Sequence, residues 1–596
     1  MGDIEVTVQS VLPSDEPQGR FSIKISKEAT VEELLKQLCR EANVPVKLNF
    51  SLRSNGQDIL RRTDSLSKRN IVDGSVLHWT SEAAERKYCK CNTFCFLATL
   101  SFLIGIAGIA TICAIRFQHV DAIMDYAIVF DAGSTHTSMF VYKWDAAKYE
   151  GTAVATQFGE TCDAKGPGIG SFENNPSAAG ASLIECLKKA ESMIPTEKYS
   201  NTPVYLGATA GMRLIQLRNP VAAEAILGSI RDTFSVSKFD LINPKTSVRI
   251  ITGSDEGVFS WVSSNYLANV FNVGPIPRFQ YSSAGALDLG GASAQITLIP
   301  EDGTMIPEGY SHTVKLYGED YNVYTHSFLC YGVVQMLNTV HAALIKATSP
   351  TVSNIQHVCL PKGYKMTESS SNIFASPCVS GSVKNRNITF VGTGNEKECR
   401  ALLSDTLFSN KSCPYSQCSF NGVYQPTVSG PFFAFSTYYF VAEFMNLTQN
   451  SATFEFEEFE NATTKLCKKT WSELQEIPIT DEHVLKDLMD YCVRAQYISL
   501  LLHDNFNFTE EEWRSVNFVA KVSGSEVGWT LGFILNESDY YVPHKPSPKI
   551  STVAFALLMV LFILFIAAGV GLTYTAYKVN LSGAFLYVKM SSYDAI

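Results

Sequence analysis

The 596-residue sequence lacks the features of several protein classes. It has no long run of lysine or arginine and a formal net charge of −10, which argues against nucleic acid as the main partner. Only 18% of the residues are charged while 46% are hydrophobic, which excludes a wholly disordered protein. The first 20 residues are polar and include Pro13 and Pro17, so we expect no cleavable signal peptide. At roughly 100–200 residues per domain, the length predicts about three to five domains.

Charged residues are also absent from two long apolar stretches, residues 94–115 and 550–572. Each has the roughly 20 residues needed to cross a bilayer, and a buried helix of a soluble domain is the less favoured alternative. Arg86, Lys87 and Lys90 precede the first stretch, which favours a cytosolic N-terminus. The sequence therefore predicts two membrane anchors, with both chain ends in the cytosol and the middle segment on the other side.

The cysteines and sequons of the middle segment are typical of an exported domain. This segment holds ten of the 15 cysteines, an even number that suits an oxidising compartment. It also holds six N-x-S/T sequons, at Asn387, Asn410, Asn446, Asn461, Asn507 and Asn536. Together they predict a glycosylated, disulfide-bonded domain outside the cytosol.

Residues 1–85 have the pattern of a small separate domain. Ile4–Gln9 and Phe21–Ile25 alternate like strands, and residues 29–43 are amphipathic, with Thr30 as a candidate helix cap. Two more short strands are expected near residues 52 and 77. This β-β-α-β-β order resembles the ubiquitin-like fold, without the C-terminal Gly-Gly needed for conjugation. It implies either a docking module for an unidentified cytosolic partner or a folded cap.

Two segments of the middle region share one pattern. DAGSTHT (131–137) follows the apolar strand 126–130, and DLGGAS (288–293) follows the short strand 286–287. In both, an aspartate ends a strand, small residues make a tight turn, and the chain returns as a strand. Neither segment is a P-loop, because G-x-x-x-x-G-K-[ST] does not occur and each turn leads into a strand.

The residue types in these turns suit phosphate binding. Glycine lets backbone N–H groups approach phosphate oxygens closely, and hydroxyl groups add hydrogen-bond donors. An aspartate at the end of a strand can hold a hydrated divalent cation that neutralises the same phosphates. One such turn alone is a weak signal, but two in one chain predict a phosphate-binding cleft.

The two loops resemble those of the actin, heat-shock ATPase and sugar-kinase superfamily. With four further segments they closely resemble the ecto-nucleoside triphosphate diphosphohydrolases, or apyrases. These segments are GATAGMRLI (207–215), ITGSDEGVFSW (251–261), YTHSFLCYG (324–332) and GWTLGFILN (528–536). The resemblance covers residues 120–572 and implies hydrolysis of extracellular ATP, ADP, UTP and UDP.

The resemblance also implies a role for each matching residue. Glu256 would be the general base, and Ser293 and Gln295 would position the attacking water. Asp131 and Asp288 would hold the water shell of Ca²⁺ or Mg²⁺. The phosphates would be bound by the two loops, through Ser134, Thr135, His136, Gly290, Gly291 and Ala292. Three residues of the 207–215 segment would shape the cleft, namely Thr209, Ala210 and Arg213. The base of the nucleotide would stack on an aromatic residue of the segment 432–440, either Tyr438 or Tyr439.

The implied architecture is an α/β fold of two ribonuclease-H-like lobes around a cleft. The expected parts are the ubiquitin-like domain (1–85), two transmembrane helices (94–115 and 550–572), lobe I (120–252 and 520–548), lobe II (253–519) and a cytosolic tail (573–596). The family pattern pairs Cys162 with Cys186, Cys330 with Cys378, Cys359 with Cys399, Cys413 with Cys418, and Cys467 with Cys492. In lobe II we expect helices at 334–346 and 485–502, and long disulfide-bonded loops between 350 and 430.

Two residues depart from the family pattern and leave open which nucleotide base the enzyme prefers. Ala294 stands where threonine is common, and Val333 replaces a basic residue expected near the nucleotide. An exopolyphosphatase-like hydrolase and a catalytically silent nucleotide receptor are the alternative functions. The plasma membrane is the expected location and an endolysosomal membrane the alternative, and a homo-oligomer is compatible with the sequence.

Overall fold

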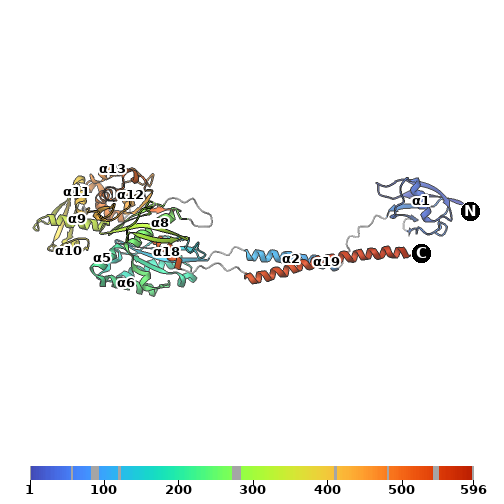
Figure 1. Ribbon diagram of the computed structural model, residues 1–596, viewed down its shortest axis with the longest axis horizontal. Helices are drawn as coiled ribbons and strands as arrows, with labels where there is room; N and C mark the ends of the chain where they lie inside the picture. The colour runs from blue at the N-terminus through green and yellow to red at the C-terminus, as the bar shows by residue number, and fades with distance from the viewer. Residues whose placement is uncertain are drawn as a thin grey trace. The chain divides into compact units, whose positions relative to one another are not determined.

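The computed structural model describes residues 2–54, 58–81, 93–117, 123–271, 283–301, 303–408, 412–479, 482–540 and 550–593 (Figure 1). The chain forms two compact units. One comprises Met1–His119 together with Pro548–Ile596, and the other is Val120–Ser547.

The N-terminal domain is a five-stranded sheet with one helix packed against it. Its strands, in the order β2-β1-β5-β3-β4, are β1 (Asp3–Ser10), β2 (Arg20–Ser26), β3 (Phe50–Ser54), β4 (Asp58–Ile59) and β5 (Val76–Ser81). Helix α1 (Val31–Glu41) begins with the predicted cap, since Thr30 and Glu33 each accept the other's backbone N–H. Apolar side chains of α1, including Leu38, and Trp79 of β5 belong to one buried core. The predicted strands and helix are present in the predicted order, and the short strand β4 is an addition that the sequence did not predict.

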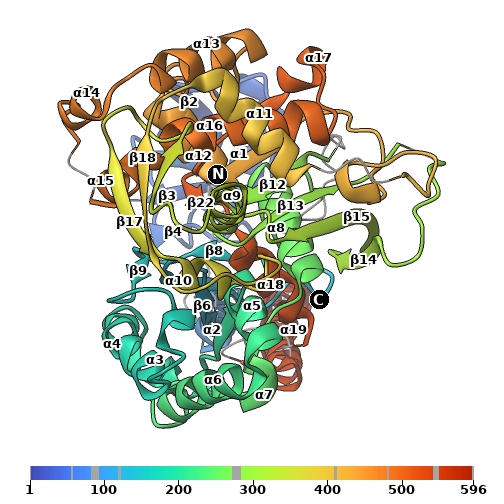
Figure 2. The same cartoon turned by 90° about the vertical axis from the view of Figure 1, so that its left-hand side faces the viewer.

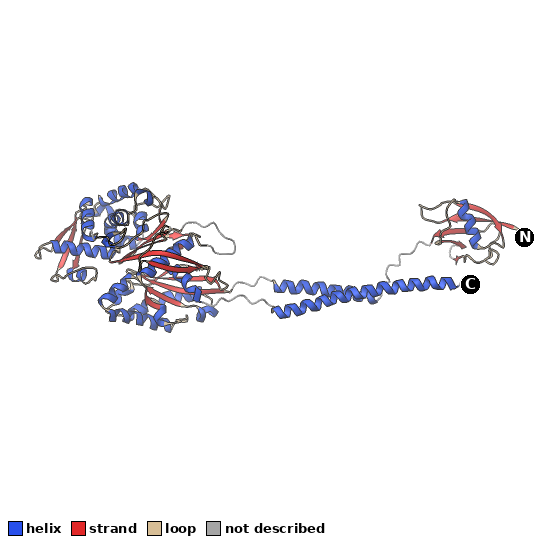
Figure 3. Ribbon diagram, viewed as in Figure 1, coloured by secondary structure: helices blue, strands red, loops and turns tan. Residues whose placement is uncertain are grey.

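Two long apolar helices, α2 (Thr93–Arg116) and α19 (Thr552–Tyr593), coincide with the predicted anchors (Figure 3). Both are long and apolar enough to cross a membrane, α19 over Thr552–Val579. They pack against each other, with Gly108 against the Phe562 ring and the Ser101 hydroxyl donating to the Phe565 carbonyl (2.6 Å). Helix α19 continues through residues 573–593, where the sequence predicted a tail.

The first lobe is built on a six-stranded sheet in the order β11-β10-β6-β7-β8, with β9 also paired to β7. The strands are β6 (Met124–Ala132), β7 (Thr137–Asp145), β8 (Thr156–Gln157), β9 (Cys162–Asp163), β10 (Val204–Ala208) and β11 (Val248–Ile250). Its helices are α3 (Ser177–Ser182), α4 (Ile184–Met193), α5 (Ala210–Arg218), α6 (Pro220–Ser235) and α7 (Pro244–Ser247). Strands β6 and β10 run parallel, so Ala132 and Ala208 end at the same edge.

The second lobe repeats this core, with a hairpin followed by a parallel strand. Its sheet order is β14-β15-β13-β12-β19-β20. The strands are β12 (Gly285–Leu289), β13 (Ser293–Leu298), β14 (Ser311–Leu316), β15 (Glu319–Leu329), β19 (Phe432–Ser436) and β20 (Val516–Phe518). Strands β12 and β13 form the hairpin, and β19 runs parallel to β12. The predicted two-lobed α/β fold is confirmed.

The helices of the second lobe partly follow the predictions. They are α9 (Val333–Ala347), α11 (Glu396–Leu407), α12 (Thr437–Phe444), α13 (Phe456–Cys467), α14 (Trp471–Gln475), α15 (Glu482–Asp487), α16 (Tyr491–Ser499) and α17 (Glu510–Trp513). The helix predicted at 334–346 is confirmed as α9. The single helix predicted at 485–502 is instead divided into α15, a 3₁₀ turn, α16 and a π-helix at Leu500–Asn505.

Residues 350–430 match the predicted disulfide-bonded loops only in part, at 375–386 and 412–431. They contain a third sheet, in the order β16-β18-β17, with strands β16 (Asn354–His357), β17 (Lys365–Ser369) and β18 (Asn387–Gly392). Helix α10 (Ser370–Phe374) and the end of α9 pack with this sheet around Phe390. The many Ser and Asn residues of this segment suggested loops, but its apolar residues form a small separate core.

Helices α8 (Gly253–Leu267) and α18 (Trp529–Glu537) join the two lobes. In Figures 1 and 2 they lie between α5 and α6 on one side and α9, α11 and α13 on the other. The α18 hydroxyl of Thr530 is 2.7 Å from the Tyr142 hydroxyl of β7, and the Gly532 N–H donates to Ser263 of α8 (2.8 Å). A short hairpin, β21 (Lys521–Val522) and β22 (Ser525–Glu526), precedes α18.

All five expected disulfides are present, Cys162–Cys186, Cys330–Cys378, Cys359–Cys399, Cys413–Cys418 and Cys467–Cys492. Four sequon asparagines, Asn387, Asn446, Asn461 and Asn507, are exposed, as glycosylation requires. Asn536 is half-buried, and Asn410 lies outside the described residues. Glycosylation at these positions stays a prediction.

Candidate active site

The two loops predicted to bind phosphate are in direct contact. A Cβ atom at Gly291 of the second loop would lie 3.2 Å from Ser134 Cβ and 3.3 Å from Thr135 Cγ2 of the first. A Cβ at Gly211, at the start of α5, would lie 2.9 Å from Ser134 Cα. Glycine at these positions allows the backbones to approach, so the two loops form one site.

The second loop is anchored by the start of helix α9. The N–H groups of Val333 and Val334 donate to the carbonyl oxygens of Gly290 (3.0 Å) and Gly291 (2.8 Å). The Cys330 N–H donates to the carbonyl of Ala292 (2.8 Å). Val333 was expected near the nucleotide, but its side chain is buried in the core of the second lobe.

The predicted general base lies on a helix rather than in a loop. Helix α8 is capped by Thr252, whose hydroxyl accepts the Asp255 N–H (3.0 Å), and Glu256 follows in the first turn. The Glu256 side chain is only 9% exposed. Its Oε2 atom accepts hydrogen bonds from Arg213 Nη2 (2.6 Å) and Gln295 Nε2 (2.9 Å). Within the described part of the chain nothing donates to its Oε1 atom.

Ser293 and Gln295 complete this buried cluster, and their expected role in positioning water stays a prediction. The Ser293 hydroxyl oxygen accepts hydrogen bonds from Arg213 Nη2 (3.1 Å) and Gln295 Nε2 (2.7 Å). Both residues project from the same face of β13, because they are two positions apart. Arg213 reaches the cluster from α5 of the first lobe, so the base is held by residues of both lobes.

Ser327 is a site residue that the sequence analysis missed. Its hydroxyl oxygen accepts a hydrogen bond from Gln295 Nε2 (2.9 Å). It lies directly opposite Gln295 in the pairing of β13 with β15. Ser327 belongs to the segment YTHSFLCYG, but only the strand register shows that it faces the cluster.

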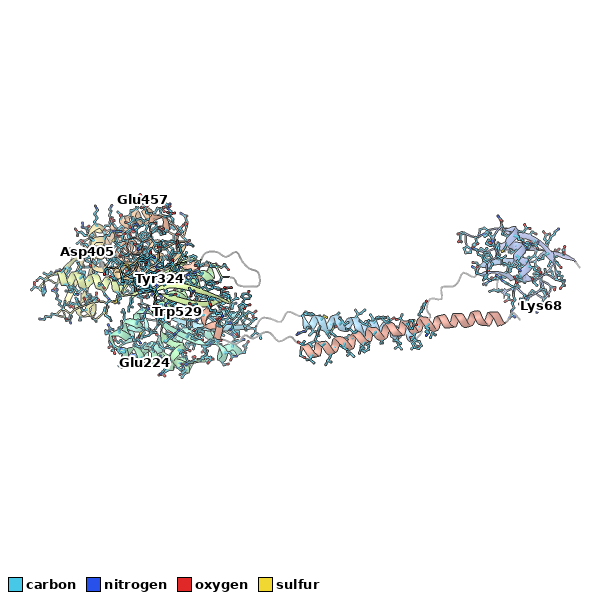
Figure 4. The ribbon with its side chains drawn as sticks, viewed as in Figure 1. Lys68, Glu224, Tyr324, Asp405, Glu457 and Trp529 are labelled. Atoms are coloured by element: carbon cyan, nitrogen blue, oxygen red, sulfur yellow. A yellow bond between two sulfur atoms is a disulfide. The ribbon has the colours of Figure 1, made fainter. Side chains whose placement is uncertain are left out.

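Asp131 and Asp288 occupy equivalent positions at the ends of β6 and β12. Burial raises the pKa of Asp131 to about 7, opposed by the nearby Trp529 indole (labelled in Figure 4) and reinforced by the charge of Asp288. Burial also raises the pKa of Asp288 to about 6, opposed by the Ser436 side chain on β19. Asp131 Oδ1 is buried and has no hydrogen-bond partner among the described residues.

This carboxylate pair fits a hard divalent cation. Two buried aspartates with raised pKa values, one of them with an unpaired buried oxygen, are suited to hold such an ion or its water shell. Among the described residues, no group of three or more His, Cys, Asp or Glu side chains could hold a metal ion. The two aspartates alone would therefore hold the ion through its bound water molecules.

Burial also raises the pKa of Glu256, to about 8. The Arg213 guanidinium lowers it, whereas the charges of Asp288 and Asp131 raise it. A divalent cation held by the two aspartates would offset this repulsion and lower the pKa of Glu256.

The other predicted residues fall into two groups. Thr135 and His136 are exposed on the first loop, with the Thr135 hydroxyl 3.0 Å from His136 Nδ1. Three others are buried. The Thr209 N–H donates to the Ala132 carbonyl (3.1 Å), and Ala210 packs with Ala292 in an apolar cluster across the lobes. The side chains of these three residues pack inside the protein, and their predicted roles at the cleft stay predictions.

The structure corrects two expectations about side chains. Tyr438 is fully buried in the core of the second lobe, so its ring has no free face and cannot stack on a nucleotide base. Tyr439 is half-buried and donates its hydroxyl hydrogen to Glu443 (2.6 Å), so it is the remaining candidate. Ala294 faces the apolar core, where a threonine hydroxyl would not reach the site.

Facing loops with paired aspartates and a buried, hydrogen-bonded glutamate define a two-lobed α/β phosphohydrolase. A model of the GDA1/CD39 (nucleoside phosphatase) family matches residues 118–546, and the chain belongs to this family.

Relatives with assigned names support this membership. The chain is 40% identical over 478 residues to ectonucleoside triphosphate diphosphohydrolase 2 of Mus musculus, covering 77% of this chain and 93% of that protein. It is 37% identical over 517 residues to ectonucleoside triphosphate diphosphohydrolase 1 of Mus musculus, covering 85% of this chain and 97% of that protein. A crystal structure of nucleoside triphosphate hydrolases from Neospora caninum shares the fold, with a TM-score of 0.55, 16% identity and coverage of 76% of this chain and 99% of that one.

Proposed function

We propose that this enzyme releases the terminal phosphate of nucleoside tri- and diphosphates by attack of a water molecule. The observation that carries the proposal is the buried cluster of Glu256, Arg213, Ser293 and Gln295, beside two contacting loops that each follow an aspartate. The names of the relatives favour nucleotides over polyphosphate.

In this mechanism the chain's own groups position water and phosphate. Glu256 Oε1 takes the proton of the attacking water while Arg213 and Gln295 hold Oε2 in place. The Ser293 oxygen already accepts two hydrogen bonds, so its own hydrogen is available to the water or to a phosphate oxygen. Ser134, Thr135, His136 and the glycines of the second loop bind the phosphates. Ca²⁺ or Mg²⁺, held through water by Asp131 and Asp288, would neutralise phosphate charge.

The substrates proposed are extracellular ATP, ADP, UTP and UDP. The two apolar helices would anchor the enzyme in the plasma membrane with both ends cytosolic. The five disulfides and the exposed sequons suit a domain outside the cytosol. An endolysosomal membrane with a lumenal domain is the alternative.

Phosphate release by intact cells that express the full chain tests this function. We expect release from ATP, ADP, UTP and UDP, and its loss in EDTA with recovery on adding back Ca²⁺ or Mg²⁺. Release from inorganic polyphosphate with none from nucleotides would indicate an exopolyphosphatase-like enzyme. Nucleotide binding without any phosphate release would indicate a silent receptor.

A further inference from the structure

The two polar atoms of the Gln295 carboxamide differ in their hydrogen-bond partners. Its Nε2 atom lies within hydrogen-bond distance of Glu256 Oε2 (2.9 Å), Ser293 Oγ (2.7 Å) and Ser327 Oγ (2.9 Å). Its Oε1 atom is buried and has no hydrogen-bond partner among the described residues. Gln295 itself is only 1% exposed, so bulk water does not satisfy this oxygen.

These contacts fix which way the amide points. An amide nitrogen has two hydrogens, and here three oxygen atoms compete for them. If the amide were turned over, its carbonyl oxygen would face the Glu256 carboxylate and the two groups would repel each other. The observed orientation therefore leaves Oε1 as a buried acceptor with no donor among the described residues.

Ser327 is held where it can restrain this amide. Strand pairing places it opposite Gln295, and a Cβ atom at Gly253 would collide with the Ser327 side chain. Gly253 is the first residue of α8, the helix that carries Glu256. Ser327 thus packs against the start of the helix that bears the base while its hydroxyl contacts Gln295.

We propose that Ser327 is a positioning residue that keeps the Gln295 amide turned so that Oε1 accepts a hydrogen bond from the attacking water. The proposal rests on the hydrolysis proposed above. The water would give one proton to Glu256 and direct its other hydrogen to Gln295 Oε1. These two contacts would point a lone pair of the water oxygen at the phosphorus. As the water oxygen bonds to phosphorus, the bond to the leaving phosphate oxygen breaks. Ser327 takes no part in that exchange.

A double-mutant cycle in the full-length enzyme tests the proposal, with Ser327→Ala, Gln295→Ala and the double variant. Thr313→Ala is the matched control, because Thr313 is an exposed hydroxyl residue on β14 of the same sheet. We expect Ser327→Ala to lower kcat for ATP by about three- to tenfold, the equivalent of one net hydrogen bond, with little change in KM. In the Gln295→Ala variant, adding Ser327→Ala should lower kcat for ATP almost no further. The control should keep wild-type kcat, and melting curves should show all four variants folded.

Two results would overturn the proposal. One is an unchanged kcat in Ser327→Ala, and the other is an equal loss with and without Gln295, which would show that Ser327 acts by another route. Hydrolysis by the wild-type enzyme in the same assay tests the proposed function separately.

Discussion

Replacing Glu256 with glutamine tests the centre of the mechanism, because the structure fixes how the new side chain must sit. Arg213 Nη2 and Gln295 Nε2 both donate to Glu256 Oε2. A glutamine must therefore place its carbonyl oxygen at this position, which puts its NH₂ group where Oε1 lies now. That group can donate to the attacking water but cannot accept its proton.

The expected loss follows from this geometry. A positioned general base contributes roughly 10²–10⁴-fold to the rate, or about 3–5 kcal/mol of transition-state stabilisation. The effect on folding is smaller than removal of the side chain would give, because both donors to Oε2 keep an acceptor and only the negative charge of the pair is lost. We therefore expect kcat to fall at least a hundredfold while the protein stays folded.

The measurement compares kcat and KM for ATP and ADP in the wild-type enzyme and Glu256→Gln. Nucleotide binding is measured by calorimetry and folding by the melting temperature. Nucleotide affinity should be almost unchanged, because the loops and aspartates that bind phosphate are untouched. A variant that retains more than about a tenth of wild-type turnover would show that Glu256 is not the base.

Other predictions address the environment of the base, the disulfides and the topology. Arg213→Met removes the cation that lowers the pKa of Glu256, so this pKa should rise above about 8 and the acid limb of the pH–kcat profile should move to higher pH. Arg213→Lys should move it less, and an unmoved limb in the Met variant would refute the pairing. Cys359→Ser removes a disulfide that stabilises the folded protein by roughly 2–4 kcal/mol, so it should reduce surface expression. Cys39→Ala changes a free thiol of the N-terminal domain and should reduce surface expression less. Equal surface levels of the two variants would contradict this prediction. Glycosidase treatment should lower the apparent mass of the protein, and protease on intact cells should spare residues 1–85; digestion of that domain from outside would reverse the proposed orientation.

The sequence alone determined the elements whose signal is local. Apolar alternation located the strands on both sides of the two aspartate loops, and charge-free length located both long apolar helices. Thr30 and Glu33 marked the start of α1, because a capping box depends on residues three positions apart. The disulfide pairs and the roles of Glu256, Ser293 and Gln295 came from resemblance to a family rather than from local pattern.

Long-range pairing decided the remainder. Residues 350–430 look like loops because their strands are short and polar, and Phe390 is buried only when the sheet, α10 and the end of α9 pack together. Ser327 enters the cluster through the register of β13 with β15, 32 residues away in sequence. Tyr438 and Tyr439 are adjacent and chemically identical, yet the packing of α12 buries one and leaves the other accessible. The type of a residue determines which chemistry it can perform. Its burial and its partners depend on segments distant in the chain, because these segments meet only when the sheets assemble.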